Sequence, residues 1–153
     1  MSANVLRAWE LCYLDPLAAR DLAREAAEGQ GTDAAEGWLL MALCEMRVGS
    51  DCVALHALAR ARLGYADTAS SAVQARGLAL CDEVQAIGLR RAGDYEASAR
   101  LHSELDQRSG FKADAMHRYI AHNSRAITAK LLGHTDSALQ HFYAASDAAQ
   151  QTG

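Results

Sequence analysis

Three glycines, Gly49, Gly93 and Gly133, each follow a stretch with helical apolar spacing and share the residue pattern around them. Seven residues before each glycine stands an alanine, five residues after it a small residue, nine after it a larger one, and twelve after it an apolar one. In that order, the positions are Ala42, Ala86 and Ala126; Ala54, Ser98 and Ala138; Leu58, His102 and Phe142; and Ala61, Leu105 and Ala145. Because small residues let two helices approach and a larger residue fills the hole beside them, the pattern predicts a repeated helix–turn–helix unit.

The composition also favours helices. Alanine and leucine supply 33 and 19 of the 153 residues, whereas valine, isoleucine and threonine together supply 13. This balance argues against a β-sandwich or a β-barrel. Pro16 suits the first turn of a helix, with Asp15 before it as the cap. We predict helices near residues 3–14, 16–29, 33–48, 51–63, 69–92, 94–108, 112–132 and 136–151.

Three segments carry a resemblance to a known family: Leu132–Ala145, Ala92–Ser98 and Trp38–Ala42. They resemble the tetratricopeptide repeat (TPR) family, with Trp38 at the family's first signature position. The spacings of about 40 and 44 residues between turns exceed the family's 34 and indicate longer helices, as in the extended repeats of bacterial regulators and kinesin light chains. His102 stands where the family usually has an aromatic or apolar residue. The resemblance implies an all-α fold, an α-solenoid of about four antiparallel helix pairs wound as a right-handed superhelix.

A single domain over residues 1–153 is therefore expected, with units near 1–31, 32–66, 67–110 and 111–153. In a stack of this kind the first helix of each pair lines a concave face. The resemblance implies a binding groove there with an apolar floor and a basic rim. Its residues would be Glu36, Leu39, Leu43, Met46, Arg47, Glu83, Ile87, Arg90, Arg91, Asn123, Ile127 and Lys130. Apolar floors take the anchor of a peptide or helix and arginines pair with carboxylates, although such arginines also serve merely to solvate a face.

Catalytic motifs are missing from the sequence. It has no phosphate-binding loop, no dinucleotide-binding glycine pattern, no serine elbow and no His-Glu-x-x-His pair. His117 and His122 lie five apart, which does not match the i, i+4 spacing of a helical metal pair. The acidic neighbours Asp82 and Glu83 would raise the pKa of the Cys81 thiol, which argues against a nucleophile. We expect no catalytic residues, no metal and no cofactor.

The formal net charge of −4 and the lack of any basic run argue against a nucleic-acid partner. The most hydrophobic stretch, Trp38–Cys44, is far shorter than the roughly 20 residues that a membrane span needs. Met1–Leu14 lacks the apolar run of a signal peptide. The four cysteines form no Cys-x-x-Cys pair and lie among apolar residues, as reduced thiols do. We therefore expect a cytoplasmic protein with no membrane partner.

These features predict a non-catalytic protein–protein interaction scaffold that binds a peptide, a helix or a neighbouring domain in its concave groove. The alternative is a regulatory or sensory input domain of a larger bacterial signalling protein, such as a diguanylate cyclase or a transcriptional regulator. A small enzyme ranks third. The last predicted helix presents Phe142 and Tyr143 where solenoids usually have a polar cap. We accordingly expect either a longer native chain or a homodimer formed through this uncapped end.

Overall fold

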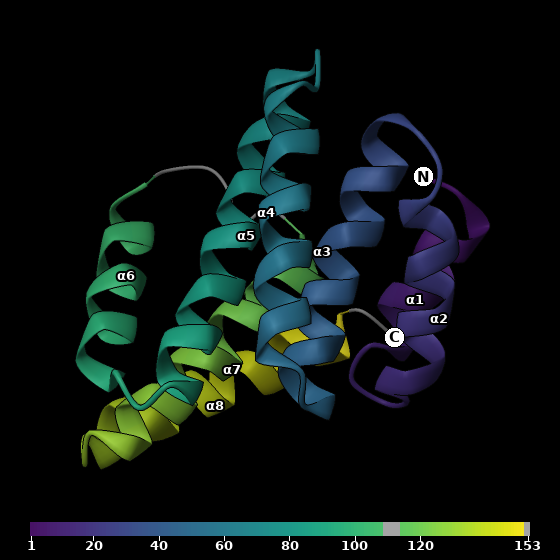
Figure 1. The fold of residues 1–153 in the computed structure, drawn as a ribbon. Helices are drawn as coiled ribbons and strands as arrows, with labels where there is room; N and C mark the ends of the chain where they lie inside the picture. Colours follow the sequence, from purple (N-terminus) through teal and green to yellow (C-terminus); the bar gives the residue numbers. More distant parts are fainter. Residues whose placement is uncertain (109–113, 152–153) are drawn as a thin grey trace. The chain divides into compact units, whose positions relative to one another are not determined.

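The computed structural model describes residues 1–108 and 114–151, and over these residues the chain is all-α (Figure 1). The described residues form eight helices and no strand. The helices are α1 (Ala3–Leu11), α2 (Pro16–Ala27), α3 (Gly31–Val48), α4 (Asp51–Ala66), α5 (Ser71–Arg91), α6 (Tyr95–Gln107), α7 (Ala115–Leu131) and α8 (Thr135–Gln150). The predicted helices are confirmed, with ends that differ by at most three residues. The predicted boundary at 110/111, residues 112 and 113 of a predicted helix, and Gly153 lie outside the described residues.

Local sequence explains how several helices begin and end. Pro16 is the first residue of α2, and the Asp15 carboxylate accepts a hydrogen bond from the backbone N–H of Ala18 at 3.1 Å, as predicted for a cap. The three turn glycines have positive φ angles of 126°, 87° and 80°, at Gly49, Gly93 and Gly133 respectively. Because glycine adopts such angles without a Cβ clash, these positions end the helices before them.

The described chain divides into two compact units, Met1–Val84 and Gln85–Gly153, with α5 contributing to both. The predicted single domain over residues 1–153 stays a prediction.

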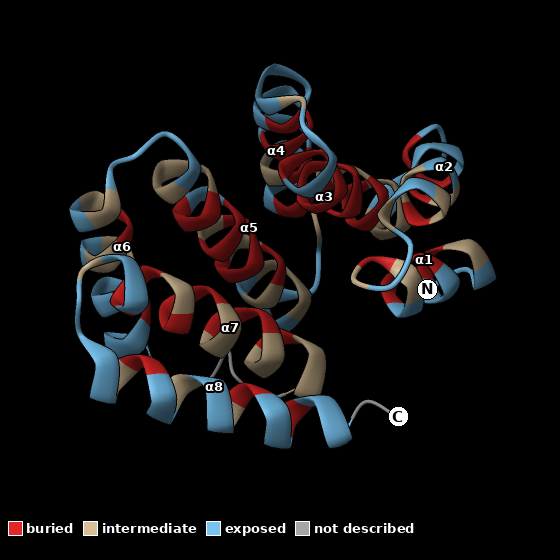
Figure 2. Cartoon of the chain, turned by 90° about the horizontal axis from the view of Figure 1, so that it is seen from below, coloured by how far each residue is buried: buried red, intermediate tan, exposed pale blue. Residues whose placement is uncertain are grey.

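In the N-terminal unit, α3 packs against both α2 and α4, and α1 packs against α2. Buried residues therefore lie on most sides of α3 (Figure 2). Gly37 marks the closest approach to α2, because a Cβ at this position would lie 2.5 Å from the backbone nitrogen of Ala27. A second glycine, Gly77 of α5, leaves room for the ring of Tyr65, which is fully buried. Small residues thus set the spacing between these helices.

In the C-terminal unit, α7 packs against α6 and α8. The Ser98 hydroxyl of α6 donates to the carbonyl of Ala86 at 2.8 Å, which ties α6 to the end of α5. Arg125 of α7 is buried and pairs with Asp106 of α6 at 3.1 Å. The outer side of α8 is exposed (Figure 2), and Tyr143 has 71% of its surface accessible.

The repeat positions behave alike in both units. The alanines seven residues before the turn glycines are all fully buried, as are two of the small residues five positions after them. The positions twelve residues after the glycines are also buried. Phe142 differs from Leu58 and His102, because it is exposed whereas they are buried. None of the described helices is long and apolar enough to cross a membrane.

Candidate functional site

Most of the predicted groove residues in the N-terminal unit are buried. Leu39, Leu43 and Met46 belong to the core around α3, and Glu36 and Glu83 are also inaccessible to solvent. Arg47 is exposed. Buried side chains cannot contact a partner unless the unit opens, so these five residues are core residues in this structure.

Glu36 is a buried carboxylate that joins three helices. It is 1% exposed and accepts a hydrogen bond from the Trp9 indole N–H of α1 at 2.9 Å. Its other oxygen accepts a bond from the Arg76 guanidinium of α5 at 2.7 Å. Burial first, and then the Glu36 carboxylate, raise the pKa of the Tyr65 phenol above its ordinary value. Glu36 therefore holds the interior of the unit together.

Arg47 lies at the surface against the turn that follows α1. Its guanidinium is 4.5 Å from the centre of the Tyr13 ring and donates to the Tyr13 carbonyl at 3.4 Å. Stacking of this kind fixes the direction of the side chain while its charge stays in contact with water.

The predicted groove residues of the C-terminal unit are more accessible. Arg90 is half-buried and donates to the backbone carbonyl of Ser124 at 3.1 Å, so it also fastens α5 to α7. Ile87 is buried at the edge of the unit. Arg91 and Lys130 are exposed, whereas Asn123 and Ile127 are half-buried. The predicted residues fall in two units, so a continuous groove stays a prediction.

Sequence reasoning did not predict an open cavity that lies in the N-terminal unit. This cavity, called the Trp38 cavity below, has a volume of about 610 Å³. It is lined by Ala27, Gly29, Gln30, Gly31, Thr32, Ala34, Ala35, Trp38, Arg60, Leu63, Gly64, Asp67, Thr68 and Ala69. The lining comes from the end of α2 and the turn after it, the first half of α3, the end of α4 and the loop after α4. Volumes of this size are typical of ligand pockets.

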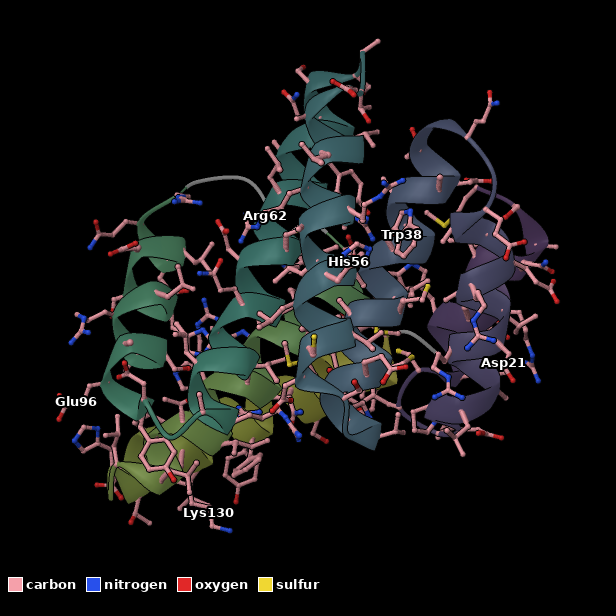
Figure 3. The ribbon with its side chains drawn as sticks, in the orientation of Figure 1. Asp21, Trp38, His56, Arg62, Glu96 and Lys130 are labelled. Carbon is pink, nitrogen blue, oxygen red and sulfur yellow. The ribbon has the colours of Figure 1, made fainter. Side chains whose placement is uncertain are left out.

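Trp38 is the large aromatic side chain of the cavity wall. It is half-buried on α3, and the exposed His56 of α4 lies beside it (Figure 3). The two rings meet edge to face with their centres 6.0 Å apart. The guanidinium of Arg60, one turn further along α4, lies 5.2 Å from the centre of the Trp38 ring. Two features of the sequence could have pointed to this part of the cavity wall. Trp38 stands at a family signature position, and His56 and Arg60 have the i, i+4 spacing that places two residues on one helix face.

The thiols are of two kinds. Cys52 is exposed, whereas Cys12, Cys44 and Cys81 are buried, and none of the four forms a disulfide. Burial is the main cause that raises the pKa of each buried thiol to about 12, and Asp82 adds to the shift at Cys81. The predicted direction for Cys81 is confirmed. A thiol with so high a pKa is a poor nucleophile at neutral pH.

Two histidines of the C-terminal unit are close neighbours. The Nδ1 atoms of His122 on α7 and His141 on α8 lie 3.1 Å apart. His102 contacts the Ser124 hydroxyl through Nε2 at 3.2 Å. Within residues 1–108 and 114–151, no three His, Cys, Asp or Glu side chains come together as metal ligands.

Comparisons with protein-family models, curated proteins and solved structures find no match to this chain.

Proposed function

We propose that this chain is a non-catalytic protein–protein interaction scaffold built from TPR-like helix pairs in a solenoid. It binds a peptide, a helix of another protein or a neighbouring domain. The observation that carries the proposal is the placing of Trp38 and Arg60 together on the wall of an open cavity of about 610 Å³. Tryptophan and arginine are the residue types most enriched among those that dominate binding energy at protein interfaces.

The burial of the repeat positions supports the helix-pair part of the proposal. Alanines and serines at fixed offsets from Gly49, Gly93 and Gly133 lie in the interior, where they let neighbouring helices pack closely. In such a stack the small residues pack in the interior, and larger polar residues on the surface are available to bind a partner. Arg47 and Arg91 remain exposed, so the predicted groove stays a second surface for binding.

A peptide selection tests the proposal. The full chain is immobilised and used to select from a phage-displayed library of random 12-residue peptides, with the bare support as control. We expect families of related peptides whose synthetic forms bind the soluble chain in fluorescence anisotropy and are displaced by unlabelled peptide. If several rounds enrich no peptide above the bare support, the proposed function is wrong.

The same peptides locate the binding surface. Arg91→Glu tests the predicted groove, since this side chain is exposed. Arg90 is less suitable, because it also holds the Ser124 carbonyl and its loss would disturb packing. Weaker peptide binding by Arg91→Glu, with unchanged circular dichroism, would place the peptide on the C-terminal unit.

A further inference from the structure

The wall of the Trp38 cavity contains an arginine that pairs with no carboxylate of the described residues. In the N-terminal unit, most arginines pair with a carboxylate within 4 Å. These pairs are Arg7–Glu10, Arg20–Glu45, Arg24–Asp21, Arg62–Asp82 and Arg76–Glu36. Arg60 is exposed and forms no such pair with any residue in the described ranges; its contact is with the ring of Trp38. Arg47 is similar, but it also donates to the Tyr13 carbonyl.

The position of Arg60 is set by its neighbours. The aromatic face of Trp38 attracts the guanidinium, and His56, one turn away on α4, meets the indole edge to face. A guanidinium held in this way loses little freedom when a carboxylate binds, so it is prepared for a bidentate pair. The indole next to it is half-buried, and its remaining surface faces the cavity.

The wall of the cavity carries a second charged residue, Asp67. Asp67 follows α4 and is seven residues from Arg60. At 1.5 Å rise per residue, the two are roughly 10 Å apart along the helix. That distance is longer than the Debye length of about 8 Å in physiological salt. Asp67 therefore does not cancel the attraction of Arg60 for an anion, and it favours an amide or a cation at its own end.

Given the proposed interaction function, on which this step rests, we infer that the Trp38 cavity binds an acidic peptide segment. The segment carries an Asp or Glu next to an aromatic or large apolar residue. Its carboxylate pairs with Arg60 and its apolar side chain packs on the Trp38 indole. The small residues of the wall, among them Gly31, Ala34 and Gly64, leave room for the peptide backbone.

Charge reversal tests this site. The random 12-residue library is selected in parallel on the wild-type chain, on Arg60→Glu and on Arg100→Glu. Arg100 is an exposed arginine of α6 in the other unit and serves as the matched control. We expect acidic–apolar peptides from the wild type and from the control, and lysine- or arginine-containing peptides from Arg60→Glu. A synthetic wild-type peptide should bind Arg60→Glu at least tenfold more weakly and bind Arg100→Glu within twofold of wild type.

Tryptophan fluorescence supplies a local readout. Trp9 is buried and bonded to Glu36, so peptide binding in the cavity should change the emission of Trp38 alone. Trp38→Phe keeps an aromatic ring in the wall and should abolish this change. Thermal unfolding followed by circular dichroism checks that each variant is folded.

The possible results separate the two proposals. If no peptide is enriched on the wild type, the interaction function fails, and the acidic-peptide site fails with it. If peptides bind but lack acidic residues, or if Arg60→Glu binds them as tightly as wild type does, the site is wrong while the interaction function stands. If ATP binds the wild type, loses affinity with Arg60→Glu and displaces the peptide, the cavity is a nucleotide site and the peptide assignment is overturned.

Discussion

The buried carboxylate of Glu36 predicts which of two single substitutions, at Glu36 or at its partner Arg76, destabilises the N-terminal unit more. Glu36 is 1% exposed, whereas its partner Arg76 is 28% exposed. Arg76→Met leaves a charged carboxylate in the interior, where it still accepts the hydrogen bond from the Trp9 N–H. Removing one partner of a buried ion pair costs about 3–5 kcal/mol, because the other charge is left uncompensated.

Removing the charge of Glu36 should destabilise the unit less than removing the charge of Arg76. In Glu36→Gln, the amide oxygen still accepts the bond from Trp9, and Arg76 can turn its charge towards water because it is partly exposed. We expect a loss of about 1.5–3 kcal/mol, the range for one hydrogen bond to a charged group. The double variant, Glu36→Gln with Arg76→Met, removes both charges. Its loss of stability should be smaller than the sum of the two single losses by about 1–3 kcal/mol.

Urea unfolding followed by tryptophan fluorescence measures these values. Both tryptophans of the chain, Trp9 and Trp38, lie in the N-terminal unit, so their emission reports the unfolding of that unit. Arg24→Met is the matched control, because Arg24 forms a solvent-exposed pair with Asp21 at 3.5 Å. Such surface pairs contribute at most about 1 kcal/mol. If Arg76→Met costs no more than Glu36→Gln or no more than Arg24→Met, the charge of Glu36 is not held in the interior and the reasoning is wrong.

Three further predictions concern packing and thiols. Gly37→Ala would gain about 1 kcal/mol in helix propensity but should lose about 1–3 kcal/mol by overpacking against the α2 backbone. The midpoint of urea unfolding should therefore fall, and a rise would refute the close approach of α3 to α2. With a disulfide reagent at pH 8, Cys52 should react rapidly, whereas the three buried thiols should react only as the chain unfolds. More than one rapidly reacting thiol per chain would contradict this prediction. Stability should fall as the pH rises from about 9 to 12, because the buried thiols keep their protons in the folded chain (pKa about 12) while those of the unfolded chain ionise near 9. Each thiol then removes about 1.4 kcal/mol per pH unit, and an unfolding midpoint that does not fall between pH 9 and 11 would exclude this.

The helices could be predicted because their limits are set by neighbouring residues. Asp15 caps α2 through a bond to a residue three positions away, and the positive φ of Gly49, Gly93 and Gly133 is a property of single residues. The small residues at fixed offsets from these glycines are in turn buried wherever the repeat places them. Local rules of this kind can be read from one sequence.

The faces of the helices were harder to predict, because burial depends on residues far along the chain. Glu36 was predicted to line a groove, but Trp9 and Arg76, 27 and 40 residues away, enclose its carboxylate. Leu39 and Leu43 are likewise buried, since α3 packs against helices on more than one side. A family pattern gives the spacing of such residues, and the neighbouring helices decide which of them reach solvent.

The candidate site depends on ion pairs of the N-terminal unit that join residues far apart in the sequence. The Asp21–Arg24 pair could be predicted, because residues three apart meet on one helix face. The pairs of Arg62 with Asp82 and of Arg76 with Glu36 span 20 and 40 residues, and no local pattern specifies them. Arg60 has the same residue type and a similar sequence context, yet the fold brings it to an indole and an open cavity instead of a carboxylate. Because Arg60 pairs with no carboxylate of the described residues and its contact is an exposed stacking on Trp38, a change of sign there should alter recognition and leave the chain folded.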